Sequence, residues 1–169
     1  MIVAKFKITK SVTLDQEAIP QAIRSSLSEV GALVEKEVRQ RTPQGVGGTQ
    51  SGLRASIFAE QRESPGLFSE VIGSNLAYAE PVEFGTRPHF PPPAALIPWV
   101  EKFLSLREGQ TAEGVAYLVA RAISRRGTKG AHMFEAGLKT AKPRLTGIFE
   151  RMGLRVATTL IKPKPGGTP

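Results

Sequence analysis

Two histidines and one pair of glutamates come closest, in type and spacing, to a catalytic or metal-binding arrangement. Glu80 and Glu83 are three residues apart, so a helix would place them on one face as an acid–base pair or a cation site. His89 sits in a proline-rich segment and His132 opens a predicted helix. The sequence favours a plainer interpretation, in which Arg87 partners the glutamates on a surface turn. We therefore expect no catalytic residue and no metal ligand.

Cysteine is absent from the chain. Thiol catalysis, disulfide bonds and zinc sites built on cysteine are therefore excluded. Two histidines alone rarely hold a metal ion. The sequence does not indicate whether the protein resides in an oxidising or a reducing compartment, because it has no thiol whose oxidation state would differ between them.

Two glycine-rich segments are similar to phosphate-binding loops in composition only. Gly45, Gly47 and Gly48 follow a predicted helix, and the GxxxxGK[ST] pattern that such loops place after a strand is missing. Residues 127–130 could hold an anion through backbone N–H groups, next to Arg125 and Arg126. A plain loop with a basic rim is the simpler interpretation of this second segment. We expect no cofactor at either place.

The net charge of +8 comes entirely from the last part of the chain. Residues 1–119 hold 12 Lys/Arg and 13 Asp/Glu, whereas residues 120–169 hold 11 Lys/Arg and 2 Asp/Glu. Such a segment either neutralises phosphates or docks on an acidic protein surface. A solvated or subunit-contacting face is favoured, because no aromatic residues lie between the cations as stacking platforms. The predicted basic face consists of Arg121, Arg125, Arg126, Lys129, Arg151 and Arg155.

The elements that would position these side chains follow from periodicity. Residues 2–9 alternate as a strand, and apolar residues three and four apart from Ile19 to Val38 predict a long helix, capped at Thr13 or Asp15 and ending near Arg41. Residues 53–63 and 67–74 then predict a hairpin. The fold class is α+β, with a long N-terminal helix and C-terminal helices packed on a small antiparallel β-sheet, and with Gly- and Pro-rich loops.

The second half of the chain predicts mainly helices. Residues 77–84 favour a helical turn ended by Gly85, with a third strand as the alternative. A proline-rich connection leads to a short helix over residues 97–104, and Thr111 caps a helix that ends at Gly127. Residues 132–161 form two helices or one bent helix, because Pro143 interrupts them. We expect one domain over residues 1–161 and a tail over residues 162–169.

No segment predicts a membrane span. The longest run without polar residues, Phe90 to Val100, is eleven residues long with four prolines, whereas a spanning helix needs about 20 apolar residues. The lysines near the N-terminus argue against a signal peptide. A cytoplasmic origin is the default expectation.

Several segments follow one another in a fixed order along the chain: Thr42-Pro43 with Ser51 to Ile57, Tyr78 to Thr86, Arg87 to Pro92, a helix around Trp99, and Ala120 to Thr128 with Phe134 and Ala136. Taken in order, these segments resemble the minor tail and neck component family of long-tailed bacteriophages, which includes tail-completion proteins. The resemblance spans roughly residues 15 to 145.

This resemblance implies a structural protein that joins head to tail, without cofactor or turnover. The implied partners are other copies in a homo-oligomeric ring and a neighbouring head–tail connector, tail terminator or tail-tube protein. A passing contact with genomic DNA is also implied. No contact with a membrane is expected. The implied location is the neck or tail of the virion, after assembly in the host cytoplasm. The expected contact residues are Pro43, Gln44, Gly47, Gly48, Arg54, Glu83, Thr86, Arg87, His89 and Phe90.

Two other classes stay open. The alternative function is a basic DNA-binding protein that contacts DNA through its C-terminal third. An enzyme, such as a lysozyme-like protein or a nuclease accessory, would need carboxylates or histidines clustered on one face.

Overall fold

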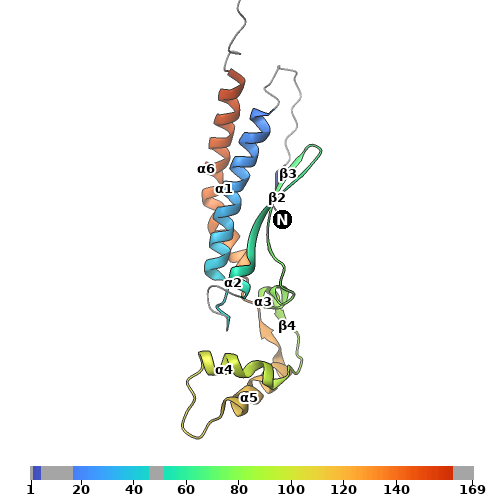
Figure 1. Cartoon of the computed structure of the whole chain (residues 1–169), viewed down its shortest axis with the longest axis vertical. Helices are drawn as coiled ribbons and strands as arrows, with labels where there is room; N and C mark the ends of the chain where they lie inside the picture. The colour runs from blue at the N-terminus through green and yellow to red at the C-terminus, as the bar shows by residue number, and fades with distance from the viewer. Residues whose placement is uncertain (1, 5–16, 46–51, 162–169) are drawn as a thin grey trace, which may run out of the picture. The chain divides into compact units, whose positions relative to one another are not determined.

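The computed structural model describes residues 2–4, 17–45 and 52–161, and its fold is mixed α+β (Figure 1). The contacts divide the chain into two compact units, each built from separated segments. Unit 1 combines segments 1–37, 58–73 and 137–169, and unit 2 combines segments 38–57 and 74–136. A single domain over residues 1–161 stays a prediction, and the expected tail lies outside the described residues.

Unit 1 contains two long helices and a three-stranded sheet. Helix α1 (Ala18–Arg41) belongs to it up to residue 37, and helix α6 (Met133–Ile161) from residue 137. The sheet has the order β1-β3-β2, with β1 at Ile2–Ala4, β2 at Ile57–Ser64 and β3 at Leu67–Ser74. Strand β1 runs antiparallel to β3, with Ile2 opposite Glu70. The expected strand over residues 2–9 is thus confirmed for residues 2–4; its remainder, and the caps Thr13 and Asp15, lie outside the described residues.

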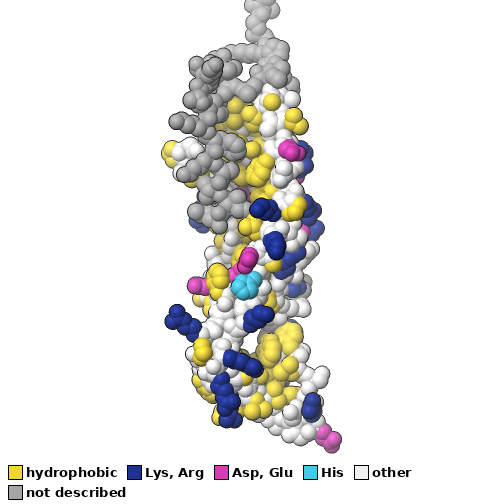
Figure 2. Space-filling model, turned by 180° about the vertical axis from the view of Figure 1, so that it is seen from behind, with side chains coloured by type: hydrophobic (Ala, Val, Ile, Leu, Met, Phe, Trp, Pro, Cys, Tyr) yellow, Lys and Arg dark blue, Asp and Glu magenta, His cyan; other side chains and the backbone are white. Residues whose placement is uncertain are grey.

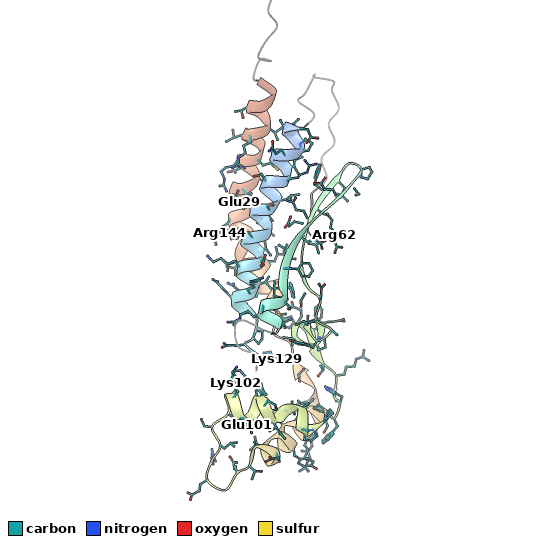
Figure 3. The ribbon with its side chains drawn as sticks, in the orientation of Figure 1. Glu29, Arg62, Glu101, Lys102, Lys129 and Arg144 are labelled. Atoms are coloured by element: carbon teal, nitrogen blue, oxygen red, sulfur yellow. The ribbon has the colours of Figure 1, made fainter. Side chains whose placement is uncertain are left out.

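Helices α1 and α6 lie side by side and antiparallel (Figures 1 and 3). Arg144 reaches Glu37 at 3.2 Å, and further along α6 Arg151 reaches Glu29. Burial of apolar side chains at helical spacing stabilises the pair. The buried residues are Ile19, Leu27, Val30 and Val34 of α1 and Ala141, Leu145, Ile148 and Met152 of α6.

Helix α6 is one helix with Pro143 inside it. The two-helix alternative for residues 132–161 is therefore wrong. A proline costs one intrahelical hydrogen bond, and the buried side chains of Ala141 and Leu145 on either side of it anchor the helix to its neighbour.

Unit 2 contains short elements. Helices α2 (Leu53–Ser56) and α3 (Ala79–Phe84) precede strand β4 (Gly85–Thr86), and the turn η1 (Pro93–Leu96) leads into α4 (Ile97–Phe103). Helix α5 (Ala112–Arg126) and strand β5 (Thr128–Lys129) follow. Helices α4 and α5 share a small core of Val100 from α4 and Ala112 and Ala116 from α5. The partly buried residues packed against this core are Leu96, Ile97 and Val115.

Most of the predicted helices of unit 2 are confirmed. Residues 79–84 are helical rather than a third strand, and Gly85 ends them as expected. The Thr111 hydroxyl caps α5 by accepting a hydrogen bond from the Gly114 N–H, at 3.1 Å. Gly127 ends α5, as the sequence predicts.

Two expectations for unit 2 are wrong. Leu53 begins a helical turn instead of a strand, because Gly52 has a positive φ of 77° and the buried Leu53 side chain is turned into the core. The strand begins only at Ile57. Residues 128–129, expected in a plain loop, form β5 and pair with β4.

Candidate functional site

Two similar tripeptides pair in unit 2: residues 85–87, Gly-Thr-Arg, and residues 127–129, Gly-Thr-Lys. We call each a Gly-Thr-cation tripeptide. Strands β4 and β5 are antiparallel, with Gly85 opposite Lys129 and Thr86 opposite Thr128. Each threonine N–H donates to the hydroxyl oxygen of the other threonine, at 3.0 and 3.1 Å, and the two hydroxyls are 2.9 Å apart. This reciprocal bonding joins segments that are 42 residues apart. It also brings Arg87 next to the basic end of α5.

Glycine is required at both crossing points of this pair. Gly85 ends α3 with φ of 80° and donates to the Pro81 carbonyl, and Gly127 ends α5 with φ of 70° and donates to the Ile123 carbonyl. A Cβ on Gly127 would lie 2.9 Å from the carbonyl carbon of Arg87. Only glycine combines this backbone conformation with so close an approach.

The carboxylate of Glu83 is buried beside this pair, with 6% of its surface exposed. Its two oxygens accept hydrogen bonds from the backbone N–H groups of Phe134, at 3.0 Å, and Glu135, at 3.3 Å. Glu83 therefore caps α6, which has no Ser, Thr, Asp or Asn directly before Met133 to do so. The expectation that Glu83 lies on a surface turn beside Arg87 is wrong, because the carboxylate is buried, and its contact with a partner stays a prediction.

Backbone hydrogen bonds hold the start of α6 against α3 as well. Ala131 N–H donates to the Val82 carbonyl at 2.8 Å, and His132 N–H donates to the Glu83 carbonyl at 3.1 Å. His132 has a φ of 48°, and its Nδ1 lies 3.6 Å from a carboxylate oxygen of Glu135. The side chain interactions of this histidine are thus with its own helix, and it forms no acid–base pair with Glu83.

The N–H groups expected to hold an anion at residues 127–130 are partly occupied. Gly127 N–H donates to the Ile123 carbonyl at 2.8 Å, and Thr128 N–H donates to the Thr86 hydroxyl. The Gly127 and Thr128 N–H groups are therefore not available to an anion while the α5 cap and the strand pair are intact, and the cations around them stay exposed.

The other expected contact residues fall into three groups. Arg54 is structural, because it donates two hydrogen bonds to the Thr42 carbonyl, at 2.6 and 3.1 Å. Pro43 and Gln44 are exposed, whereas Gly47 and Gly48 lie outside the described residues. The arm after β4 is exposed at Arg87, His89 and Phe90: His89 Nδ1 lies 3.0 Å from the Arg87 carbonyl, and the Phe90 ring contacts the Tyr117 ring edge to face.

The predicted basic face is divided between the units. Arg121, Arg125, Arg126 and Lys129 lie in unit 2, and Arg151 and Arg155 lie in unit 1. All six are exposed, as expected. Arg151, however, forms an ion pair with Glu29 of α1, so it stabilises unit 1 as well as carrying charge.

Large apolar side chains are exposed mainly in unit 2. Of the ten in the described residues, only Leu154 lies in unit 1. Figure 2 shows hydrophobic side chains gathered over α4 and α5. Exposed apolar side chains that gather on one face, as those over α4 and α5 do, mark contact sites for other molecules. We call the unit-2 set the apolar surface: Tyr78, Phe84, Phe90, Trp99, Phe103, Leu104, Leu106, Tyr117 and Leu118.

Unit 1 holds two buried acids that the sequence did not single out: Glu37, which pairs with Arg144, and Glu70. Glu70 of β3 is 5% exposed and packs on Gly31 of α1, where a Cβ would lie 2.7 Å from the Glu70 carboxyl carbon. Burial raises the pKa of Glu70, partly offset by a hydrogen bond from Gln61. One of its oxygens, Oε2, has no hydrogen-bond partner among the described residues.

The described residues contain no group of three His, Asp or Glu side chains placed to hold a metal ion. Within the same ranges, every helix is too short or too polar to cross a membrane. Comparison of the chain with protein-family models, curated proteins and solved structures finds no match. The case for a function therefore depends on the chain's own residues.

Proposed function

We propose that this chain is a structural subunit of a tailed bacteriophage virion, a neck or tail-completion component that joins head to tail as part of a homo-oligomeric ring. The observation that carries the proposal is the apolar surface of unit 2. Phe84 exposes 70% of its surface and Phe90 exposes 53%. An isolated copy would leave these rings in water, at a cost of about 25 cal/mol per Å² of apolar area that contact with another molecule would remove.

The placement of the resembling segments supports this proposal. Residues 78–86 and residues 120–128, which carry two of the family-like segments, end in the strands that pair as β4 and β5. Glu83 and the two glycines there serve packing and capping rather than chemistry. A structural role accounts for such residues without any turnover.

The implied partners are further copies of the chain and neighbouring connector, tail terminator or tail-tube proteins. The test is to purify tailed particles from cells that express the gene, and to locate the chain with antibodies. We expect a fixed number of copies per particle and labelling where head meets tail. Particles that assemble normally without the chain, or contain none of it, would contradict the proposal.

A further inference from the structure

The strand pair gathers cations that the sequence separates. Arg87 directly follows β4, Lys129 ends β5, and Arg125 and Arg126 form the last residues of α5. Arg121 lies one helical turn before Arg125, a rise of about 6 Å. We call these five exposed side chains the unit-2 basic surface: Arg87, Arg121, Arg125, Arg126 and Lys129.

No carboxylate neutralises this surface from its own segments. Residues 84–100 and 114–134 contain no Asp or Glu at all. Of the acids that flank these two segments, Glu83 is buried and hydrogen-bonded to the start of α6, whereas Glu101, Glu113 and Glu135 are exposed. In unit 1, by contrast, Arg24, Arg144 and Arg151 each have a glutamate partner.

We propose that the unit-2 basic surface binds the phosphate backbone of double-stranded nucleic acid, without reading its sequence. Lysine and arginine bind duplexes largely by neutralising phosphates and releasing condensed counterions. Each strand of a DNA duplex carries one phosphate per about 3.4 Å along the duplex axis. The rise of about 6 Å from Arg121 to Arg125 therefore matches about two phosphate spacings. Arginine suits such contacts because its planar group donates two hydrogen bonds to one phosphate.

The acidic residues of unit 2 do not match this charge in a second copy. Residues 101–113, the most acidic exposed stretch of the unit, hold three glutamates but also Lys102 and Arg107; Figure 3 labels Glu101 and Lys102 in α4. The net charge of this stretch, −1, cannot balance five cations. A single strand fits less well too, because no aromatic residue lies between the cations of residues 120–130 to stack on bases, and the exposed rings of Phe90 and Tyr117, with centroids 6.1 Å apart, pack edge to face on each other.

The test measures binding of the full chain to a mixed-sequence DNA duplex of about 20 base pairs by fluorescence anisotropy, over a range of salt concentrations. The variant is Arg125→Gln with Arg126→Gln. Its matched control is Lys139→Gln with Lys142→Gln, which removes the same charge from exposed positions of unit 1. Both variants are surface changes, and circular dichroism checks that each is folded.

We expect Arg125→Gln/Arg126→Gln to weaken binding by about tenfold for each lost contact at about 0.1 M salt. The slope of the logarithm of the binding constant against the logarithm of the salt concentration should become shallower by about two. Arg125→Lys/Arg126→Lys should bind nearly as well as the unchanged chain. The control pair should change the affinity by less than about threefold. The inference fails if the duplex does not bind, if the control weakens binding as much as the variant does, or if single-stranded DNA or poly-glutamate competes better than duplex. The result is independent of self-association, because the substituted arginines lie outside the apolar surface.

Discussion

The carboxylate of Glu83 caps a helix that begins 50 residues later in the chain, by accepting a hydrogen bond from the backbone N–H of Phe134 at 3.0 Å. Helix starts leave N–H groups without partners, and a buried carboxylate also interacts favourably with the positive end of the helix dipole. The contact therefore links the segment before β4 to the start of α6. It makes Glu83 a stabilising residue of unit 2.

Replacement of this cap should cost stability. In Glu83→Gln one carboxylate oxygen becomes an amide group that cannot accept, so one buried N–H loses its partner. We expect the free energy of unfolding to fall by about 1 to 2 kcal/mol in urea titrations. Glu80→Gln, on the exposed side of the same helix, is the control and should change it by less than about 0.5 kcal/mol. Equal losses in the two variants would refute the capping role.

The close crossing at Gly127 should make alanine more harmful there than at an open glycine. Gly109 has a similar φ, 77°, and a Cβ placed on it would meet nothing within 4 Å, whereas a Cβ on Gly127 meets backbone atoms of Thr86 and Arg87. Gly109→Ala should cost about 1 kcal/mol from conformation alone. Gly127→Ala should cost about 1 to 3 kcal/mol more, because backbone must move. Thermal or urea unfolding of both variants measures the difference. Similar losses of stability would show that the backbone at Gly127 can accommodate a Cβ, contrary to the close approach of Thr86 and Arg87.

Buried Glu70 should make unfolding depend on pH in one direction. Because burial raises its folded-state pKa, its contribution to stability is complete below the unfolded-state pKa of about 4.3 and is lost as pH rises through the folded value. Glu70→Gln should therefore be more stable than the unchanged chain at pH 7 and should flatten this decline. The measurement is the free energy of unfolding in urea from about pH 4 to pH 8.

Glu63 supplies the control of opposite sign for this experiment. A hydrogen bond from Arg24 lowers the pKa of Glu63, so its contribution is present above the unfolded-state pKa and is lost as pH falls through the lowered folded value. Glu63→Gln should therefore lower the free energy of unfolding above about pH 4.3 and flatten its decline at lower pH. If Glu70→Gln instead lowered stability at pH 7, the buried carboxyl would be a favourable ion there, contrary to its environment.

Periodicity and capping residues predict the longer helices, although not the short helix α2. Apolar residues from Ile19 to Val38 predict α1, and Thr111 and Gly127 mark both ends of α5. These signals are local, because capping and helical spacing involve residues close in sequence. The strand pair β4–β5 is not predicted, since two-residue strands have no periodicity.

Long-range partners cannot be predicted in the same way. The sequence places Glu83 on the surface, because nothing near it shows the helix start that it caps. One signal is available: Gly130, Ala131 and His132 offer no capping side chain before α6, which indicates a cap from elsewhere. The Gly-Thr-cation tripeptide, present at residues 85–87 and 127–129, is also visible but too short to stand out as a repeat.

The mass of the chain in solution tests most directly the claim that the apolar surface joins copies to one another. Phe84 and Leu154 are matched for this purpose, since they expose 70% and 67% of their surfaces and lie in helices of different units. By native mass spectrometry and light scattering we expect the unchanged chain and Leu154→Ala to form the same multi-copy assembly, and Phe84→Ala to shift toward monomer at equal concentration. A chain that stays monomeric at every concentration, or Phe84→Ala and Leu154→Ala assembling alike, would contradict it.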